Sequence, residues 1–422
     1  MRVLIINTTE RIGGAAIAAG RLMEALKNNG IKAKMLVRDK QTNQITVVAL
    51  RKSWKNIWNF VWERIVIWAN NNFRRHKLFF VDIANTGTDI TSLPEFKQAD
   101  VIHLHWINQG MLSLKNIKRI IDSGKPIVWT MHDMWPVTGI CHHSENCRLF
   151  ATQCRNCPLL YNNHSHDLSY KVFRRKSKLY SGINTRITFV ACSYWLEDLA
   201  RQSALTKGHK VLSIPNPINT NLFHPGNKKF AKQKLHLPTD KRLLLFNSMK
   251  ITDKRKGIDY LVEACEILKR ERPEFCETLA VVVVGRESQQ YNALFPFSVY
   301  CLNYVKSEKE LVDIYNAVDL FVTPSIQENL PNTIVEAMSC GVPCVGFNVG
   351  GIPQMIDHLH NGYVAKYKSA SDLANGIWWS FHEGDYKTLS EIARHKAITT
   401  YSEDIVAHQY IKVYNYVTKK NE

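Results

Sequence analysis

Two glutamates, Glu328 and Glu336, are separated by seven residues in a segment whose neighbours give them a chemical setting. The segment follows the apolar run 320–322, which predicts a buried strand, and it leads into a predicted helix. A carboxylate in such a loop lies at the edge where open α/β sheets bind ligands. Asn332 and Thr333 fall near the helix N-terminus, whose free N–H groups favour a phosphate. Glu336, a turn further on, is placed to accept hydrogen bonds from a ribose diol.

Short apolar runs recur along the chain and predict the strands that must position these residues. In the first half they are residues 3–6, 34–37, 101–105, 127–131 and 187–191, and in the second half 243–246, 280–285, 320–322 and 344–347. Helical segments are expected between them, at 15–29, 257–270 and 307–317. Strand and helix alternate in both halves, which predicts an α/β protein with two successive Rossmann-like domains.

The length of 422 residues favours two domains of about 200 residues each. Two prolines within 214–218 stop regular structure and mark the join. We therefore predict an N-terminal domain over 1–212, with a cysteine-rich insert at 139–160, and a C-terminal domain over 213–400. A last helix is expected within 401–422. One possible arrangement is that this helix packs back against the first domain.

Positive charge is concentrated in the first half of the chain. The net charge of +18 divides into 31 Lys and Arg against 14 Asp and Glu over 1–212, and 24 against 23 over 213–422. This asymmetry fits an anionic partner, such as a membrane surface or a phosphorylated acceptor, or else a solvated surface that keeps the protein soluble. No nucleic-acid motif is recognised, so no nucleic acid is expected as a partner.

No apolar run reaches the roughly 18 residues that a membrane-spanning helix needs, and the N-terminus has no signal-peptide core. The expected location is therefore cytoplasmic, with peripheral attachment to the inner face of the plasma membrane as the option that the charge suggests.

Residues 54–68 are relevant to membrane attachment because they contain an apolar stripe rich in tryptophan. Trp54, Trp58, Val61, Ile65 and Trp68 form one helical stripe. The stripe fits either a bilayer interface or packing on the domain core.

Four of the ten cysteines fall within 17 residues in the spacing C-x5-C-x6-C-x2-C. They are Cys141, Cys147, Cys154 and Cys157. In a cytosolic protein such a cluster is more typical of metal binding than of disulfides. Four thiolates closing a loop without secondary structure suit a structural zinc ion. Free thiols, or partial ligation by His142 or His143, are the alternatives.

Two further features lie after predicted strands of the first half. Gly13 and Gly14 follow the first strand and form either a turn or a loop that lets backbone approach a phosphate closely. His132 follows the strand at 127–131, and His105 ends the strand at 101–105. The position of His132 at a strand's carboxyl end favours a functional role over a packing role, whereas both roles stay open for His105.

The segment from Glu328 to Glu336 resembles the E-x7-E signature of retaining glycosyltransferases of family GT4. Lys256-Gly257 resembles the conserved Lys-Gly pair of that family, and Lys250 stands where the family has a diphosphate-binding arginine. Lys250 keeps the charge but lacks the guanidinium fork, so Arg255 is an alternative contact.

In the first half, Gly13-Gly14 matches the family's glycine loop, and Thr130-Met131-His132-Asp133 resembles its active-site histidine segment. His103-Leu104-His105-Trp106 and residues 129–135 resemble, more narrowly, the bacterial surface-polysaccharide enzymes of colanic-acid type, which share the cysteine-rich insert.

The resemblance implies a GT-B fold, with two Rossmann-like domains facing each other across a cleft. It implies a retaining glycosyltransferase that moves a sugar from a nucleoside-diphosphate sugar to a glycan or lipid-linked acceptor in cell-surface polysaccharide biosynthesis. His132 and Glu328 would be catalytic. The donor would contact Gly13, Gly14, Lys250, Lys256, Asn332, Thr333 and Glu336. No D-x-D motif is placed to bind a metal, so no catalytic metal is expected.

Two other classes of function compete with this interpretation. One is a sugar-nucleotide epimerase or a phosphorylase on the same two-domain scaffold. The carboxylate segment with Lys256 disfavours the epimerase, and the phosphorylase lacks a recognisable lysine-bound pyridoxal site. The other is a membrane- or nucleic-acid-binding module that uses the basic half, which leaves the carboxylate segment unexplained.

Overall fold

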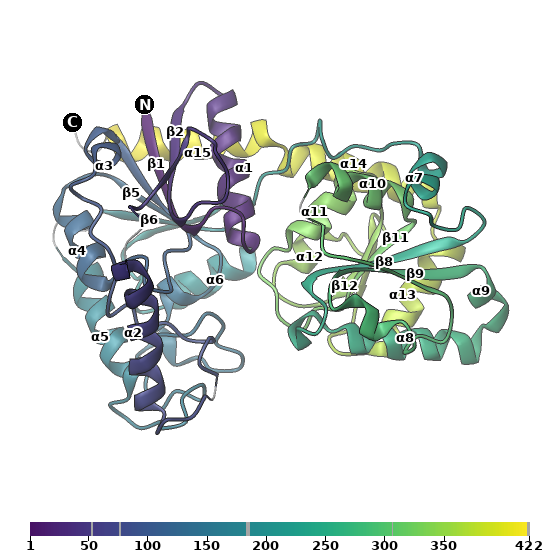
Figure 1. Ribbon diagram of the computed structural model, residues 1–422, viewed down its shortest axis with the longest axis horizontal. Coiled ribbons are helices and arrows are strands. Elements are labelled where there is room, and N and C mark those ends of the chain that lie inside the picture. The colour runs from purple at the N-terminus through teal and green to yellow at the C-terminus, as the bar shows by residue number, and fades with distance from the viewer. Residues whose placement is uncertain (52–53, 76, 183–185, 306, 420–422) are drawn as a thin grey trace. The chain divides into compact units, whose positions relative to one another are not determined.

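The computed structural model describes residues 1–51, 54–75, 77–182, 186–305 and 307–419. The chain forms two compact units, and each is described by itself (Figure 1). Unit 1 comprises Met1–Pro215 together with the chain from Val406 onward, and unit 2 comprises Asn216–Ile405. The chain therefore leaves unit 1 directly after a proline and returns to it within the last helix.

Unit 1 is built on a seven-stranded sheet in which every neighbouring pair is parallel, in the order β3-β2-β1-β4-β5-β6-β7. The strands are β1 (Arg2–Thr9), β2 (Lys32–Asp39), β3 (Val47–Ala49), β4 (Val101–Leu104), β5 (Ile127–Met131), β6 (Ile187–Ala191) and β7 (Lys210–Ser213). The helices are α1 (Gly14–Asn28), α2 (Trp54–Asn70), α3 (Pro94–Gln98), α4 (Leu114–Asp122), α5 (Leu168–Tyr180), α6 (Tyr194–Gln202) and α15 (Glu403–Lys419), with short 3-10 turns η1 (Trp135–Val137) and η2 (Leu149–Ala151).

Unit 2 has a six-stranded parallel sheet in the order β10-β9-β8-β11-β12-β13. The strands are β8 (Arg242–Lys250), β9 (Leu279–Arg286), β10 (Val299–Leu302), β11 (Leu320–Thr323), β12 (Cys344–Phe347) and β13 (Gly362–Ala365). The helices are α7 (Lys228–Lys234), α8 (Ile258–Glu271), α9 (Pro273–Glu277), α10 (Glu308–Ala317), α11 (Asn332–Ser339), α12 (Ile352–Met355), α13 (Ala370–His382) and α14 (Tyr386–Tyr401), with turns η3 (Lys254–Lys256) and η4 (Ser288–Tyr291).

These two parallel sheets confirm the predicted α/β class. The buried central strands were predicted from their continuous apolar runs, and the structure adds the edge strands β3, β7, β10 and β13 to them. Edge strands are short and exposed on one side, so their sequences carry a weaker signal. In each unit the parallel order brings the carboxyl ends of the strands to one edge of the sheet.

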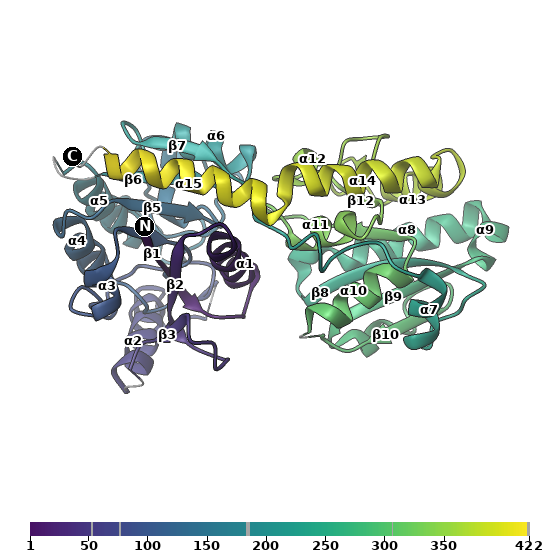
Figure 2. The ribbon, with the colours of Figure 1, turned by 90° about the horizontal axis from the view of Figure 1, so that it is seen from above.

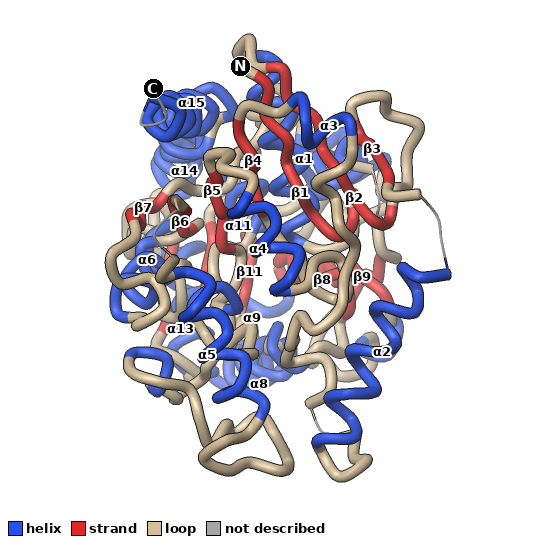
Figure 3. The backbone as a smooth tube through the Cα atoms, turned by 90° about the vertical axis from the view of Figure 1, so that its left-hand side faces the viewer, coloured by secondary structure: helices blue, strands red, loops and turns tan. Residues whose placement is uncertain are grey.

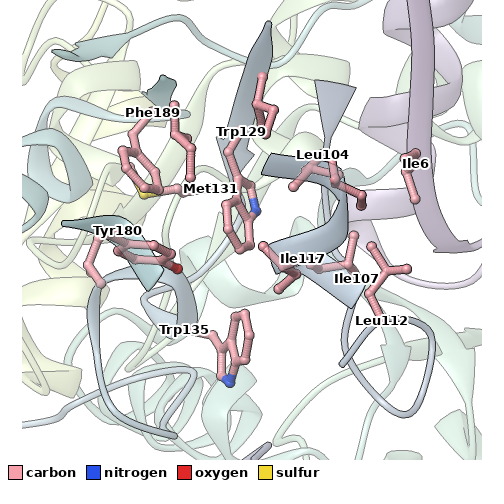
Figure 4. Packing of buried hydrophobic residues seen from close by; sticks show 14 of the residues in the cluster. Ile6, Leu104, Ile107, Leu112, Ile117, Trp129, Met131, Trp135, Tyr180 and Phe189 are labelled. Carbon is pink, nitrogen blue, oxygen red and sulfur yellow. The ribbon is translucent and has the colours of Figure 1, made fainter. Parts of the chain in front are cut away.

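Buried side chains cover both faces of the unit 1 sheet. One cluster contains Trp129 and Phe189, whose rings stack with centroids 5.9 Å apart, together with Trp135 and Tyr180 (Figure 4). The other cluster joins β1 and β2 to helices α1 and α15. Aromatic burial on this scale supplies much of the hydrophobic free energy of the unit.

Helix α2 does not pack its tryptophan stripe against the core. Trp54, Trp58, Trp62 and Trp68 are all exposed, whereas Glu63 is buried on the opposite side of the helix. The interpretation of the stripe as a core-packing face is therefore wrong. Among the helices of the described residues, none is long and apolar enough to cross a membrane.

The last helix, α15, completes the core of unit 1 from Val406 onward (Figure 2). Two of its tyrosines are buried and reach polar groups of the sheet. The Tyr414 hydroxyl is hydrogen-bonded to Nδ1 of His103 at 2.8 Å, and the Tyr410 hydroxyl to that of Thr130 at 2.8 Å. The helix is thus fixed to the two strands, β4 and β5, that lead to His105 and His132.

We expect Tyr414→Phe to lower the free energy of unfolding of unit 1 by about 2 kcal/mol, because it leaves the buried Nδ1 of His103 without its partner. Chemical denaturation followed by near-UV circular dichroism measures the change. The matched control is Tyr416→Phe on the same helix, where the ring is exposed. Equal stability of the two variants would contradict the structural role of the Tyr414 hydroxyl.

Candidate functional site

Glu328 lies in the loop that follows β11, at the carboxyl edge of the unit 2 sheet. Its carboxylate forms an ion pair with Nζ of Lys256 and accepts a hydrogen bond from the Ser325 hydroxyl at 3.2 Å. The Glu328 side chain is 12% exposed and that of Lys256 is 33% exposed. The pair is therefore held within the protein yet keeps access to solvent, as a ligand-binding pair must.

Two glycines allow the backbone to hold this pair. Gly257 has a φ of 70°, and a Cβ atom there would overlap the carbonyl oxygen of Pro324. Gly350 has a φ of 58°, and a Cβ atom there would overlap the carbonyl oxygen of Glu328. Only glycine meets both conditions without strain. The backbone N–H of Ile326 also donates to the carbonyl of Arg255 at 2.8 Å, so the loop after β11 is tied to the turn that carries Lys256.

Glu336 is buried in helix α11, and its Oε2 accepts a hydrogen bond from the Tyr315 hydroxyl at 2.9 Å. Pro331 precedes the helix, and no side chain caps its first N–H groups. Asn332 begins the helix and accepts a hydrogen bond from the Nδ2 of Asn216 at 3.0 Å, while Thr333 is partly buried. The helix N-terminus therefore presents backbone donors next to the segment that holds Glu328.

The two further cations of this edge are engaged differently. Lys250, at the end of β8, is largely exposed and lies 3.5 Å from the carboxylate of Glu287. Arg255 forms a two-pronged pair with Asp253, at 3.0 and 2.7 Å, and this pairing raises the pKa of the guanidinium. Lys250 is therefore the more accessible of the two cations for a phosphate, whereas the carboxylate of Asp253 fixes the orientation of the Arg255 guanidinium.

In unit 1, Gly13 precedes helix α1 with a φ of 90°, and a Cβ atom there would meet nothing within 4 Å. Gly13 is therefore required by its backbone conformation and not by crowding. Gly14 is the first residue of α1 and is exposed. The first turn of this 15-residue helix has no side-chain cap, so it offers backbone N–H groups at the carboxyl end of β1.

His132 follows β5 at the same edge of the sheet, beside His105 from the end of β4. Nε2 of His132 lies 2.9 Å from Nδ1 of His105, and its Nδ1 lies 3.6 Å from the sulfur of Cys192. Desolvation lowers the pKa of His132 to about 4, and desolvation, together with the nearby histidines, holds the pKa of buried His105 well below its usual value. His132 is therefore neutral at physiological pH and suited to hydrogen bonding without charge.

Asp133, the residue after His132, belongs to a buried charge network that the sequence did not reveal. Nδ1 of His142 lies 2.7 Å from Asp133, and its Nε2 lies 2.6 Å from Asp82. Burial opposes the charged imidazole, but the two aspartates outweigh it and raise the pKa of His142 to about 10. Arg64 forms an ion pair with the other oxygen of Asp82. The His132-Asp133 dipeptide was the only available signal, because the remaining members are far apart in sequence.

The four clustered cysteines line one cavity of about 20 Å³. The backbone N–H of Gly139 donates to the sulfur of Cys154 at 3.2 Å, a contact that favours a thiolate. Desolvation nevertheless raises the pKa of Cys141, Cys154 and Cys157 to about 12 each. In the described part of the chain, no group of three or more His, Cys, Asp or Glu has metal-binding geometry. The thiols therefore share a cavity large enough for one ion without being arranged as a ligand set.

Partial metal ligation by His142, one of the alternatives drawn from the sequence, does not fit this structure. Both of its ring nitrogens are occupied by carboxylates. The buried Lys176 lies beside the cysteine cavity and donates to the carbonyl oxygen of Thr138 at 3.0 Å. Desolvation lowers the pKa of Lys176 to about 7.

Each half of the chain matches a model of a known family. Residues 12–222 match Glycosyltransferase Family 4, and residues 240–381 match Glycosyl transferases group 1.

Solved structures show the class of fold. A glycosyltransferase from Rickettsia africae has a TM-score of 0.67 at 16% identity and covers 99% of this chain and 98% of its own. Anabaena HepE in complex with UDP-glucose has a TM-score of 0.64 at 16% identity, with coverage of 98% and 99%.

The protein has the GT-B class of fold, as these likenesses show. The match to Glycosyltransferase Family 4 covers residues 12–222, which is half of the chain. The chain therefore belongs to glycosyltransferase family 4.

Curated relatives carry related names. D-inositol 3-phosphate glycosyltransferase of Thermobispora bispora is 33% identical over 36% of this chain and 38% of its own length. An α-1,3-N-acetylgalactosaminyltransferase of Campylobacter jejuni, named for an N,N'-diacetylbacillosaminyl-diphospho-undecaprenol, is 28% identical over 46% and 52%. The putative colanic acid glycosyl transferase WcaC of Escherichia coli is 20% identical over 74% and 76%. The chain thus spans about half or less of the length of the first two relatives.

We expect His142→Gln to destabilise unit 1 by about 3 kcal/mol at pH 6, because it removes a buried cation from two aspartates. The folded pKa of His142 lies above the unfolded value, so its contribution is complete below about pH 6.5 and is lost as pH rises towards 10. The difference from the wild type in thermal unfolding should therefore shrink between pH 6 and pH 10. Exposed His166→Gln is the control, and a difference independent of pH would contradict a charged His142.

Proposed function

We propose that this protein is a retaining glycosyltransferase that takes a sugar from a nucleoside-diphosphate sugar bound by unit 2. The observation that carries the proposal is the pairing of Lys256 with Glu328 at the carboxyl edge of a parallel sheet, beside the uncapped N-terminus of α11. A cation and a helix N-terminus suit a diphosphate, and a carboxylate suits a sugar. The complexes of Anabaena HepE with UDP-glucose and with UDP support a donor of this class.

The chemistry follows from the charges at this edge. Breaking the anomeric carbon–oxygen bond leaves an oxocarbenium-like centre and adds negative charge to the departing diphosphate. Lys256, Lys250 and the α11 N-terminus would stabilise that charge electrostatically, without a catalytic metal. Glu328 would position the donor sugar or stabilise the positive centre, and the departing phosphate would take the acceptor proton. Gly13, Gly14 and the neutral His132 of unit 1 would contact the donor phosphate and the sugar or acceptor.

The acceptor that we propose is a glycan or a lipid-linked saccharide of a cell-surface polysaccharide. Relatives named for colanic acid, amylovoran and a diphospho-undecaprenol saccharide support this class. We also propose that the protein acts in the cytoplasm, at the inner face of the plasma membrane. The excess of Lys and Arg in residues 1–212 supports that location, since this leaflet is anionic.

Donor binding is tested by thermal shift with a panel of nucleoside-diphosphate sugars, followed by donor hydrolysis and transfer assays for each hit. Glu336→Ala should weaken the binding of the stabilising donor by about tenfold, because it removes a buried acceptor for the ribose. Glu328→Ala should leave the donor bound but reduce turnover by at least about a hundredfold. Glu391→Ala, an exposed glutamate of the same unit, is the matched control. If no nucleotide or sugar nucleotide stabilises the protein, the proposal fails.

We further propose that Cys141, Cys147, Cys154 and Cys157 bind a structural zinc ion that holds the insert together. The shared cavity and the N–H donor at Cys154 support this proposal, although the thiols must move closer to become ligands. The insert has little secondary structure beyond η2, so a metal would replace a core that it is too small to build.

Elemental analysis of the purified protein should give close to one zinc ion per chain, and a strong chelator should lower the thermal stability of unit 1. Cys154→Ser should lose the metal, whereas Cys192→Ser, a buried cysteine outside the insert, should retain it. Metal-free protein whose stability is unchanged by chelator or by added zinc would exclude the zinc site and leave the four residues as free thiols.

A further inference from the structure

Helix α2 turns a largely polar side towards the protein, with Ile67 as its one fully buried apolar side chain among the described residues of the helix. Oε1 of Glu63 accepts hydrogen bonds from the backbone N–H groups of Ile83 and Ala84, at 2.8 and 2.7 Å. Arg64 forms a buried ion pair with Asp82. These contacts fix the rotation of the helix about its axis, because neither Glu63 nor Arg64 can be moved into solvent without breaking the buried network.

The opposite side of the helix is apolar and faces solvent. We call this side the tryptophan face; its members and their exposed fractions are Trp54 (71%), Ile57 (70%), Trp58 (49%), Trp62 (43%), Ile65 (37%) and Trp68 (36%). A surface helix of a soluble protein normally has the reverse arrangement, with its apolar stripe on the core. Contiguous exposure of this kind marks an interaction surface.

The surroundings of the tryptophan face are basic. Residues 51–77 contain seven Lys and Arg and a single acidic residue, Glu63, which is buried. Arg51, Lys55, Arg74 and Arg75 are exposed. Figure 3 shows α2 at the edge of unit 1, apart from the strands of that unit. A partner would therefore meet aromatic rings first and positive charge around them.

We propose that the tryptophan face is a membrane contact that inserts into the headgroup region of an anionic lipid bilayer. Tryptophan favours the interface between headgroups and acyl chains, because its ring is apolar and its N–H is polar. The surrounding Lys and Arg are attracted by anionic headgroups. A second copy of the chain is a poorer partner, since two such faces would bring like charges together.

This contact rests on the membrane location in the proposed function and names the surface that would provide it, but it requires neither a sugar nucleotide nor catalysis. It would hold unit 1 at the surface from which a lipid-linked acceptor is reached. Its test therefore uses the full chain without substrate, so that failure of vesicle binding and failure of donor binding are separate results.

The experiment is flotation of the full chain with vesicles of phosphatidylglycerol and phosphatidylcholine in equal parts, and with vesicles of phosphatidylcholine alone. The chain should float with the anionic vesicles, more weakly at high salt and with the neutral vesicles. The double variant Trp58→Ser with Trp62→Ser should bind the anionic vesicles at least about tenfold more weakly. Phe230→Ser, at an exposed aromatic position of unit 2, should bind as the wild type does.

Thermal unfolding and size-exclusion chromatography accompany the flotation. The double variant should still unfold cooperatively, with a small loss of thermal stability because it removes the stacking of the two rings, whose centroids lie 5.9 Å apart. All variants should elute as the wild type does. The proposal is overturned if the wild type does not bind anionic vesicles, or if the double variant binds them equally well. It is also overturned if the wild type is a dimer that the double variant dissociates, which would make the face a contact between copies.

Discussion

Every strand in both sheets runs parallel to its neighbours, and this constraint decides where polar side chains can gather. Parallel strands end on one edge, so the residues that follow them are brought together whatever their distance in sequence. In unit 2 this brings Lys250, Glu328 and Gly350 to one edge, after β8, β11 and β12. In unit 1 it does the same for His105 and His132. The chemistry of each unit therefore depends on the register of its buried strands.

The buried charges of unit 1 form one network, which includes Asp133 beside the candidate site residue His132. Arg64 and protonated His142 are the cations, and Asp82 and Asp133 are the anions. Burial and the adjacent Asp82 raise the pKa of Glu63 to about 8, so this carboxyl holds its proton at neutral pH. Two positive and two negative groups then remain, which limits the desolvation cost of burying them. The indole of Trp106 also donates to Asp133 at 2.8 Å, which satisfies a further lone pair.

The sequence predicts the buried strands and the site residues that are adjacent along the chain. It does not predict how helices are oriented or which side chains from other elements they contact. The run Val281–Val284 could only be a buried strand, whereas β3 spans three residues and β13 begins with a glycine. The segment around Glu328 was found because its residues are adjacent, but the Tyr315 partner of Glu336 lies on another helix. The helical periodicity predicted that the tryptophans of α2 share one side, but it did not predict which side of the helix faces the protein. The orientation of the helix is determined by Glu63 and Arg64, whose partners lie about twenty residues further along the chain.

One hydrogen-bonded path joins the orientation of α2 to the histidine site. Arg64 on the helix is paired with Asp82, Asp82 with His142, and His142 with Asp133, the neighbour of His132. Rotating α2 to bury its tryptophans would pull Arg64 out of this path and leave Asp82 with one cation fewer. Removing one partner from a buried charge network costs about 3–5 kcal/mol, on the order of the gain from burying two tryptophans. The same charges that set Asp133 beside His132 therefore hold the apolar side of α2 in solvent.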